Sequence, residues 1–249
     1  MKIAVIGKGW VGKSMIELFP DSVIYDEPLG IGTKEEVNAC DVAFICVPTP
    51  CPEKGRLDTS IVFDVAEWCE CPLKIVRSTV NPGDCEQLPG NIVFQPEYLG
   101  ETPAHPMLHP VDRPFIILGG HPENVRKVID LYATVYNANT TIRQTSLKEA
   151  EIIKLSENRA IAFKVAQCQE LYDACEAAGV NYYTIRDAVY GDDPRFNLWW
   201  TFIYPDKRGF NSKCIPKDIY AWQAWAESVG ADTHVTRHLL KRNEGLING

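Results

Sequence analysis

The chain has 249 residues, enough for one large domain or two small ones, and its 45% hydrophobic content allows a sizeable core. Its net charge of −8 is not gathered into acidic or basic blocks, which argues against nucleic acid or an anionic membrane as the main partner. No apolar run reaches the length of a membrane span, so we expect a cytoplasmic protein.

The first 26 residues predict a dinucleotide-binding strand, turn and helix. An apolar strand at 1–6 leads into the pattern G-x-G-x-x-G, and a helix follows to about residue 19. Such glycines permit a tight turn and let the backbone approach a pyrophosphate, whose charge the helix N-terminus meets. A second strand at 23–25 ends in Asp26, a carboxylate that can bind ribose hydroxyls and would repel a 2′-phosphate, so NAD is favoured over NADP. The expected cofactor residues here are Gly7, Gly9, Trp10, Val11, Gly12 and Asp26.

Strands and helices continue to alternate up to about residue 145. Further strands are expected at 41–47, 73–77, 92–95 and 114–118, with helices at 59–68 and 122–133. The pattern predicts an α/β fold, a Rossmann-like doubly wound parallel sheet over residues 1–145. Ligands of such sheets lie beyond the carboxyl ends of the strands. The loops at those ends carry Val47, Pro48, Thr49, Ser78, Thr79 and Glu97.

From Ser146 the pattern predicts a mostly helical second domain, residues 146–249. Ser146 and Glu149 form a capping box, and no glycine or proline interrupts the chain until Gly179, which gives a helix of about 30 residues. We expect this helix to join two copies in a homodimer. Lys154 and Asn158 are one turn apart and share a face of it, although a surface lysine with an asparagine neighbour would have the same spacing. A short helix is expected at 183–190, then an aromatic loop and two closing helices.

Cys214 immediately precedes the start of a predicted helix. Pro216 suits a first helical turn, and the N–H groups there would favour the thiolate of Cys214, with Asp218 four residues further on. The alternative is a small apolar filler, the commonest role of an intracellular cysteine. Lys213 belongs to a small basic group with residues 207 and 208, which would suit either a substrate phosphate or a solvated loop.

The remaining cysteines and histidines predict neither disulfides nor a metal site. The nine cysteines are an odd number and contain no C-x-x-C pair, so most are expected to be reduced and structural. Two histidine pairs, His105 with His109 and His234 with His238, have helical spacing, but no third ligand is evident.

Six motifs occur in one order along nearly the whole chain. They are GKGWVG, CVPTP followed by GRLDTS, RSTVNPG, QPEYLGETPA, EAEIIKLSEN, and the pair DDPRF and GFNSKCIPKD. In the same order, these segments resemble the cofactor fingerprint, the VPTP and LDTS segments, STVPPG, NPEFLREG, EAEMIKLFSN, and DPRIG with GFGGSCFPKD of the UDP-glucose/GDP-mannose 6-dehydrogenases. Members of that family oxidise a nucleotide-sugar alcohol to the acid.

The resemblance implies a two-step oxidation of a nucleotide sugar with NAD as cofactor. Cys214 would capture the aldehyde as a thiohemiacetal and then carry the thioester. Lys154 and Asn158 would stabilise the developing oxyanion. Each substrate molecule would yield two NADH, and Cys214→Ser would stall before the acid.

The resemblance also assigns roles around water and substrate. Water that releases the acid would be oriented by Asp218, or by Thr79 with Glu97. Glu101 would lie near substrate and nicotinamide, and Arg195 would reach the substrate of a partner subunit. The expected substrate contacts are Glu97, Tyr98, Leu99, Glu101, Lys154, Asn158, Arg195, Lys213 and Cys214.

Three departures from the family pattern bear on the substrate site. The family normally continues into a third domain that helps to hold the nucleotide, whereas this chain ends about where that domain would begin, so a short form is expected. Residues 211–213, Asn-Ser-Lys, replace the glycine pair before the cysteine, and Gly100 replaces an arginine. These changes leave the sugar and the nucleotide open, and Lys213 could supply a phosphate contact of its own.

Two other functions remain open at this point. One is a one-step NAD-dependent hydroxyacid or sugar alcohol dehydrogenase that uses Lys154 and Asn158 without thiol chemistry, and the NADH stoichiometry distinguishes it. The other is a catalytically weak dinucleotide-binding protein. Retention of Cys214, Lys154, Asn158 and Asp218 together favours an enzyme, since a binding protein has no chemical need for them.

Overall fold

The structure is a computed structural model that describes residues 1–52, 55–100, 107 and 109–248. The chain divides into two compact units, Met1–Lys154 and Leu155–Gly249. The boundary falls inside helix α5, Leu147–Ala178. This helix begins with the expected capping box, in which the Ser146 hydroxyl accepts from the Glu149 N–H. The predicted helix of about 30 residues is therefore confirmed.

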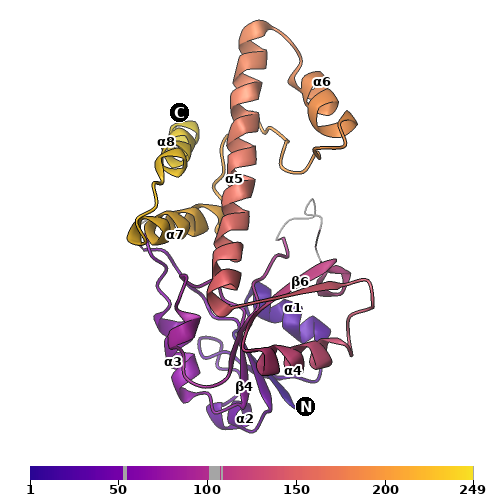
Figure 1. The fold of residues 1–249 in the computed structure, drawn as a ribbon, viewed down its shortest axis with the longest axis vertical. Coiled ribbons are helices and arrows are strands. Elements are labelled where there is room, and N and C mark those ends of the chain that lie inside the picture. The colour runs from indigo at the N-terminus through magenta and orange to yellow at the C-terminus, as the bar shows by residue number, and fades with distance from the viewer. Residues whose placement is uncertain (53–54, 101–106, 108, 249) are drawn as a thin grey trace. The chain divides into compact units, whose positions relative to one another are not determined.

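A seven-stranded sheet forms the centre of the first unit (Figure 1). Its strands are β1 Ile3–Ile6, β2 Val23–Tyr25, β3 Val42–Ile45, β4 Leu73–Val76, β5 Ile92–Phe94, β6 Phe115–Gly120 and β7 Thr141–Thr145. In space their order is β2-β1-β3-β4-β5-β6-β7. The order reverses between β1 and β3, and in such sheets a ligand lies outside the carboxyl ends of the strands at that reversal. The predicted Rossmann-like architecture is confirmed.

The sheet differs from the wholly parallel prediction at one junction. Strands β5 and β6 pair antiparallel, through Val93 with Gly120 and Phe94 with Gly119, whereas the other neighbouring strands are parallel. Parallel neighbours need a long crossover, usually a helix. The described part of the β5–β6 connection contains only the short 3₁₀ turn η2, Pro110–Asp112, so the chain enters β6 in the opposite direction.

Helices cover both faces of the sheet (Figure 1). Helices α1, Trp10–Leu18, and α4, Pro122–Tyr132, pack on one face; α2, Lys34–Asn38, α3, Ser60–Trp68, and the start of α5 pack on the other. Along β1, Ile3 and Val5 belong to the first of these cores while Ala4 and Ile6 belong to the second. This period of two explains why the strand sequence is apolar throughout: each side chain is buried on one face or the other.

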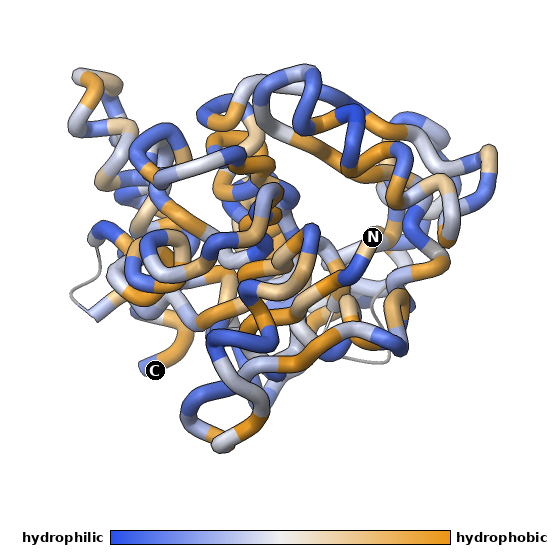
Figure 2. Tube along the Cα trace, turned by 90° about the horizontal axis from the view of Figure 1, so that it is seen from below, coloured by the Kyte–Doolittle hydropathy of each residue, from blue (hydrophilic) through white to orange (hydrophobic). Residues whose placement is uncertain are grey.

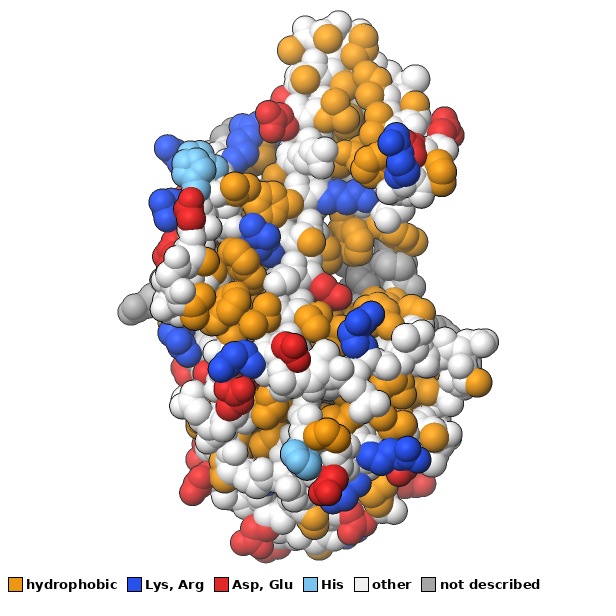
Figure 3. Space-filling view, in the orientation of Figure 1, with side chains coloured by type: hydrophobic (Ala, Val, Ile, Leu, Met, Phe, Trp, Pro, Cys, Tyr) orange, Lys and Arg blue, Asp and Glu red, His pale blue; other side chains and the backbone are white. Residues whose placement is uncertain are grey.

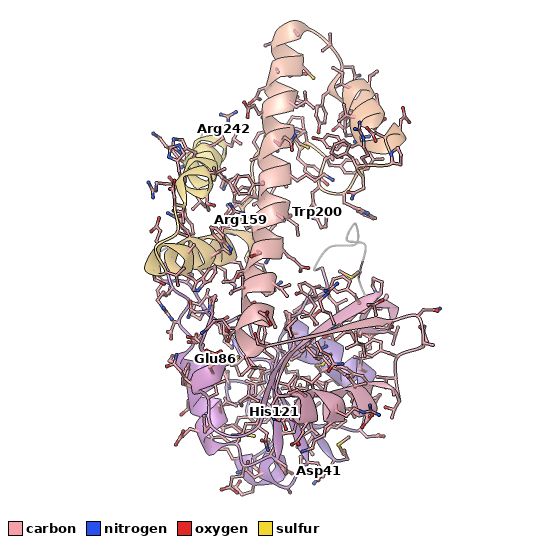
Figure 4. The ribbon with its side chains drawn as sticks, in the orientation of Figure 1. Asp41, Glu86, His121, Arg159, Trp200 and Arg242 are labelled. Carbon is pink, nitrogen blue, oxygen red and sulfur yellow. The ribbon has the colours of Figure 1, made fainter. Side chains whose placement is uncertain are left out.

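Helices also form the second unit (Figure 1). The continuation of α5 is followed by α6, Tyr182–Arg186, a π-helical turn, Asp187–Asp192, then α7, Ile215–Ser228, and α8, His234–Asn248. Ala162 of α5 shares a core with Ile219 and Leu239 of the last two helices. The Arg159 guanidinium, labelled in Figure 4, lies 4.1 Å from the Trp222 ring centroid, and its Nε donates to the Thr236 hydroxyl. These contacts fix α7 and α8 against α5.

Hydrophobic and hydrophilic residues are interspersed along the chain, as the hydropathy colouring of Figure 2 shows. In the part of the chain that the structure describes, none of the helices combines the length and the apolar character that a bilayer span requires. Charged residues recur along even the 32-residue α5, so this helix is not apolar.

Candidate active site

The turn between β1 and α1 has the geometry that its glycines predict. Gly7 has a φ of +91°, and a Cβ built on it would lie 2.5 Å from the Cys46 carbonyl oxygen. A Cβ on Gly12 would lie 1.8 Å from the Gly7 carbonyl oxygen. Both positions therefore need glycine for the fold itself.

Gly9 differs, because a Cβ built on it would meet nothing within 4 Å. It is the N-cap residue of α1, and glycine has no side chain with which to cap the first N–H groups of the helix. The turn thus presents an open backbone surface at a helix N-terminus, which is what a pyrophosphate requires. The neighbouring Trp10 is exposed and Val11 is half-buried.

Asp26 is held against this turn. Its Oδ2 accepts from the Lys8 N–H at 2.7 Å, and its Oδ1 accepts from the Leu29 N–H at 3.1 Å. A carboxylate offers about four lone-pair sites, so acceptor capacity remains for ribose hydroxyls. The residues of this edge fit the adenosine and pyrophosphate half of NAD.

The loops after β3 and β4 are joined at the same edge of the sheet. The Ser78 hydroxyl donates to the Val47 carbonyl at 2.6 Å. Thr49 is buried, Pro48 is exposed and Thr79 is half-buried. The hydrogen bond brings together two segments that the sequence predicts as cofactor-facing.

Glu151, on the second turn of α5, fastens the β4 loop and was not singled out from the sequence. Its side chain is completely buried, and its carboxylate accepts from the backbone N–H groups of Gly83 and Cys85, the latter at 2.8 Å. Burial raises the pKa of Glu151 above its usual range, although these hydrogen bonds oppose the shift. In the sequence, the one sign that Glu151 binds another segment is its position on the apolar face of the helix.

Glu97 is surrounded by donors. Its carboxylate accepts from Arg77, from Arg113 at 2.6 Å, and from the backbone N–H groups of Tyr98 and Leu99 at 2.7 and 2.9 Å. Burial alone would raise its pKa, but the two arginines and the backbone donors outweigh burial and lower the pKa to about 2. Such a carboxylate is a permanent anion that can orient a neighbour but takes up a proton poorly. The sequence did not predict either arginine as a partner of Glu97.

Lys154 lies close to the same segment. Its side chain is buried, and its Nζ is 5.0 Å from the centroid of the half-buried Tyr98 ring. The face of an aromatic ring attracts an ammonium group. The ring of Tyr98 in turn packs 5.2 Å from that of Phe115. Glu101, expected near the nicotinamide, lies outside the described residues.

In the second unit, the start of α7 brings three predicted residues together. Asn158 Nδ2 donates to the buried Asp218 carboxylate at 2.5 Å, and Lys217 Nζ forms an ion pair with the other oxygen at 2.7 Å. The Asp218 N–H donates to the Cys214 carbonyl, which closes the first turn of the helix. Cys214 itself is the N-cap residue, is exposed, and is in no disulfide. Lys217 was not predicted.

Two cations that the sequence predicts as substrate contacts, Arg195 and Lys213, lie on the surface of the second unit. Arg195 is exposed and forms a two-point ion pair with the Asp193 carboxylate, with Nε and Nη2 at 2.9 and 2.6 Å from its oxygens. Exposed pairs of this kind contribute little to stability, so they can be exchanged for another anion. Lys213 is exposed beside Cys214. Neither side chain is committed to the core.

A cavity of about 420 Å³ in the first unit lies elsewhere. Its lining includes Ile92, where β5 begins, and His121, the N-cap residue of α4, which Figure 4 labels with Glu86. The cavity is therefore at the amino end of β5, away from the predicted ligand edge. Glu86 and Glu123 also line it, and these acids suit an anionic cofactor poorly.

Comparison with known families finds two matching domains. Residues 25–137 match the NAD binding domain of the UDP-glucose/GDP-mannose dehydrogenase family, and residues 148–245 match the central domain of the same family. Together the two matches cover most of the chain, and residues 1–24, 138–147 and 246–249 lie outside them.

Individual relatives point the same way. A UDP-glucose 6-dehydrogenase of Rickettsia typhi is 30% identical over 221 residues, which are 82% of this chain and 49% of the relative. The chain thus spans about half the length of the curated relatives it matches. A UDP-glucose dehydrogenase structure from Pyrobaculum islandicum aligns with a TM-score of 0.82 at 22% identity, over 98% of this chain and 68% of that one. A Pyrococcus horikoshii UDP-D-ManNAc dehydrogenase structure gives a TM-score of 0.80 at 22% identity, over the same shares. These two structures show the shared fold.

Proposed function

Because the chain belongs to the UDP-glucose/GDP-mannose dehydrogenase family, we propose that it binds NAD and oxidises a nucleotide-sugar alcohol to the acid. The observation that carries the proposal is the start of α7. There an exposed thiol stands one helical turn before a buried carboxylate that is bonded to Asn158 and Lys217. We propose that this arrangement supports the addition of a thiol to a sugar aldehyde, with Cys214 as the nucleophile and the Asn158 amide as a donor to the developing oxyanion.

We assign the binding of NAD to the edge formed by the β1–α1 turn and the loops after β3 and β4. Gly9 leaves room for the pyrophosphate, and Asp26 has acceptor capacity for the ribose. Thr49 and Thr79 belong to the loops that would line the rest of the cofactor. NAD would accept the hydride in each oxidation, and residues of the chain would supply the nucleophile, the oxyanion donors and the groups that orient water.

The sulfur of Cys214 is proposed to add to the aldehyde carbon after the first oxidation, giving a thiohemiacetal. Lys154 and Asn158 would stabilise the negative charge on its oxygen, since both carry N–H donors. A second oxidation would give the thioester. Water oriented by Asp218, or by Thr79 with Glu97, would then release the acid and regenerate the thiol.

Substrate contacts are proposed from the segment after β5 and from the surface cations of the second unit. Tyr98 and Leu99 are half-buried and adjoin the fixed Glu97 carboxylate. Lys213 and Arg195 are cations free to meet a diphosphate, Arg195 by exchange of its exposed carboxylate partner. The structural neighbours include enzymes named for UDP-glucose and for UDP-D-ManNAc, so the sugar is left open.

The test is the yield of NADH with a panel of UDP- and GDP-sugars. Two NADH per sugar are expected from the parent protein. Cys214→Ser should release no acid, whereas the parent should release one acid for each sugar consumed. One NADH per sugar would instead support a one-step alcohol dehydrogenase. No NADH with any sugar, despite NAD binding, would refute the proposed activity.

We also propose that the second unit forms a homodimer. On the face shown in Figure 3, hydrophobic side chains gather over α5 and α6. Large apolar side chains of this unit are exposed, and they include Tyr183, Phe196, Trp199, Phe202 and Tyr204. An apolar surface of this kind is typical of a subunit interface. Light scattering after size exclusion should give twice the monomer mass, and Trp199→Asp should lower it. A monomeric parent at micromolar concentration would contradict the assignment.

A further inference from the structure

Asn81 is where the β4 loop departs from the family motif, with asparagine in the place of the first proline of STVPPG. Its side chain is buried. The amide makes two hydrogen bonds with a single residue of another loop: Oδ1 accepts from the Leu57 N–H at 2.8 Å, and Nδ2 donates to the Leu57 carbonyl at 3.0 Å. The side chain thus pairs with a backbone residue as a neighbouring strand would.

Asp84 fixes the orientation of this amide. Its Oδ2 accepts from Asn81 Nδ2 at 2.9 Å and from the Asn81 N–H at 3.1 Å. The same oxygen accepts from the Thr59 hydroxyl at 2.9 Å. Because Nδ2 faces two acceptors, the Asp84 carboxylate and the Leu57 carbonyl, the nitrogen and oxygen of the amide cannot be exchanged. The oxygen and the nitrogen of the Asn81 amide therefore each face complementary partners, and the amide has one orientation.

The hydrogen bonds between Asn81 and Leu57 hold one end of the β3–α3 connection, which carries residues predicted to contact NAD. The connection between β3 and α3 begins with Val47, which Ser78 holds, and ends near Leu57, which Asn81 holds. The two ends also contact each other, since the Asp58 N–H donates to the Pro50 carbonyl at 2.8 Å. Both ends of the segment are thus tied to the β4 loop, which carries Thr79.

We propose that Asn81 is a positioning residue that holds Leu57, near the end of the β3–α3 connection, in the position that NAD binding requires. The choice of NAD rests on the proposed function, while the contact itself does not. Without the amide, the N–H and carbonyl of the buried Leu57 lose their partners, and the loop gains freedom that binding must then remove. Asn81 does not touch the reacting atoms in this proposal.

Two substitutions and a matched control test the inference. Asn81→Ala removes both bonds to Leu57. Asn81→Asp keeps an acceptor for the Leu57 N–H but sets a carboxylate against Asp84 and against the Leu57 carbonyl. Asn91→Ala is the control, because Asn91 is exposed just before β5 and its Nδ2 donates to the carbonyl of Pro72, just before β4, at the amino ends of these strands.

The first measurement is amide hydrogen exchange of the protein without NAD, in a peptide that contains Leu57. Exchange at Leu57 should be about tenfold faster in both Asn81 variants, which corresponds to the loss of one or two net hydrogen bonds, and unchanged in Asn91→Ala. Exchange that is the same in Asn81→Ala as in the parent would overturn the inference.

The second measurement is the Kd for NAD by calorimetry. Asn81→Ala should bind about fivefold to tenfold more weakly than the parent, and Asn91→Ala should bind as the parent does. Faster exchange with unchanged NAD affinity would overturn the positioning role while leaving the contact in place. A parent protein that does not bind NAD would overturn the proposed cofactor, and the exchange result would still decide whether Asn81 holds the loop.

Discussion

Gly9 and Gly12 belong to one motif, but the structure predicts opposite consequences for adding a methyl group to each. At Gly12 the methyl would lie 1.8 Å from the carbonyl oxygen of Gly7, a backbone atom that can move only with β1. At Gly9 it would meet nothing within 4 Å. Gly12→Ala should therefore lower the stability of the fold, whereas Gly9→Ala should weaken NAD binding without affecting stability.

The magnitudes follow from these surroundings. Overpacking against backbone should lower the free energy of unfolding of Gly12→Ala by about 3 kcal/mol or more. That corresponds to a fall in Tm of roughly 6 to 12 °C for a chain of this size. Gly9 has φ −75° and ψ −161°, which alanine adopts easily. Loss of a glycine N-cap, about 0.5 kcal/mol, is offset by a similar gain from the stiffer unfolded chain, so Tm should change by under about 2 °C.

The assay combines thermal unfolding with calorimetric titration of NAD. Gly9→Ala should keep the parental Tm and bind NAD at least about tenfold more weakly, a loss of about 1.4 kcal/mol, because its methyl occupies the approach of the pyrophosphate. Gly245→Ala, in α8 and also open within 4 Å, is the control for a harmless methyl group. Parental NAD affinity in Gly9→Ala would refute the placement of the pyrophosphate at this turn.

Three further predictions concern buried groups. Glu97→Gln leaves Arg77 and Arg113 buried without their anion, so the free energy of unfolding should fall by about 3 to 5 kcal/mol in urea titrations; parental stability would show that the carboxylate is dispensable. Because the pKa of Glu97 is about 2 when folded and 4.5 ordinarily, its stabilisation should be complete above about pH 4.5 and lost as the pH falls towards 2. The difference in unfolding free energy between the parent and Glu97→Gln, measured against pH, should therefore be constant from pH 5 to 7 and shrink in acid; a difference that grows in acid would reverse the sign of the argument. Asn158→Asp replaces a donor to Asp218 with a second carboxylate in a buried site, so the Tm should fall, and kcat for NADH formation, measured below that Tm, should fall about 10²- to 10³-fold; unchanged kcat would remove Asn158 from the oxyanion site.

The sequence predicted the parts of the fold that depend on local pattern. The fingerprint turn, the apolar strands and the capping box of α5 each have a signal within a few residues. Strand β7 was missed because its sequence TIRQT is mostly polar and lies at the edge of the sheet, where only half-burial is needed. Helix α2 was not predicted because it has only five residues, although Thr33 and Glu36 form a capping box at its start.

The sequence did not predict the direction of every strand or the contacts between residues far apart in the chain. The antiparallel β6 depends on how the chain returns to the sheet, and no residue of the strand encodes it. Arg77 follows a buried strand and reads as the end of that strand, so its own burial and its bond to Glu97 became visible only in the fold. The roles of Cys214 and Lys154 in catalysis stay predictions, as the comparisons identify the family and its domains.

The arginine and carboxylate cluster has a consequence for salt dependence. Among the described residues, two guanidinium groups and one carboxylate leave a surplus positive charge inside the domain, beside the ends of β4 and β5. The Ser14 hydroxyl of α1 donates to the same carboxylate at 3.3 Å, so this surplus sits directly behind the helix that begins at the fingerprint. Small ions in solution cannot enter to shield an interior charge as they shield a surface lysine. Its attraction for an anion at that edge should therefore persist at ionic strengths that abolish ordinary surface attraction.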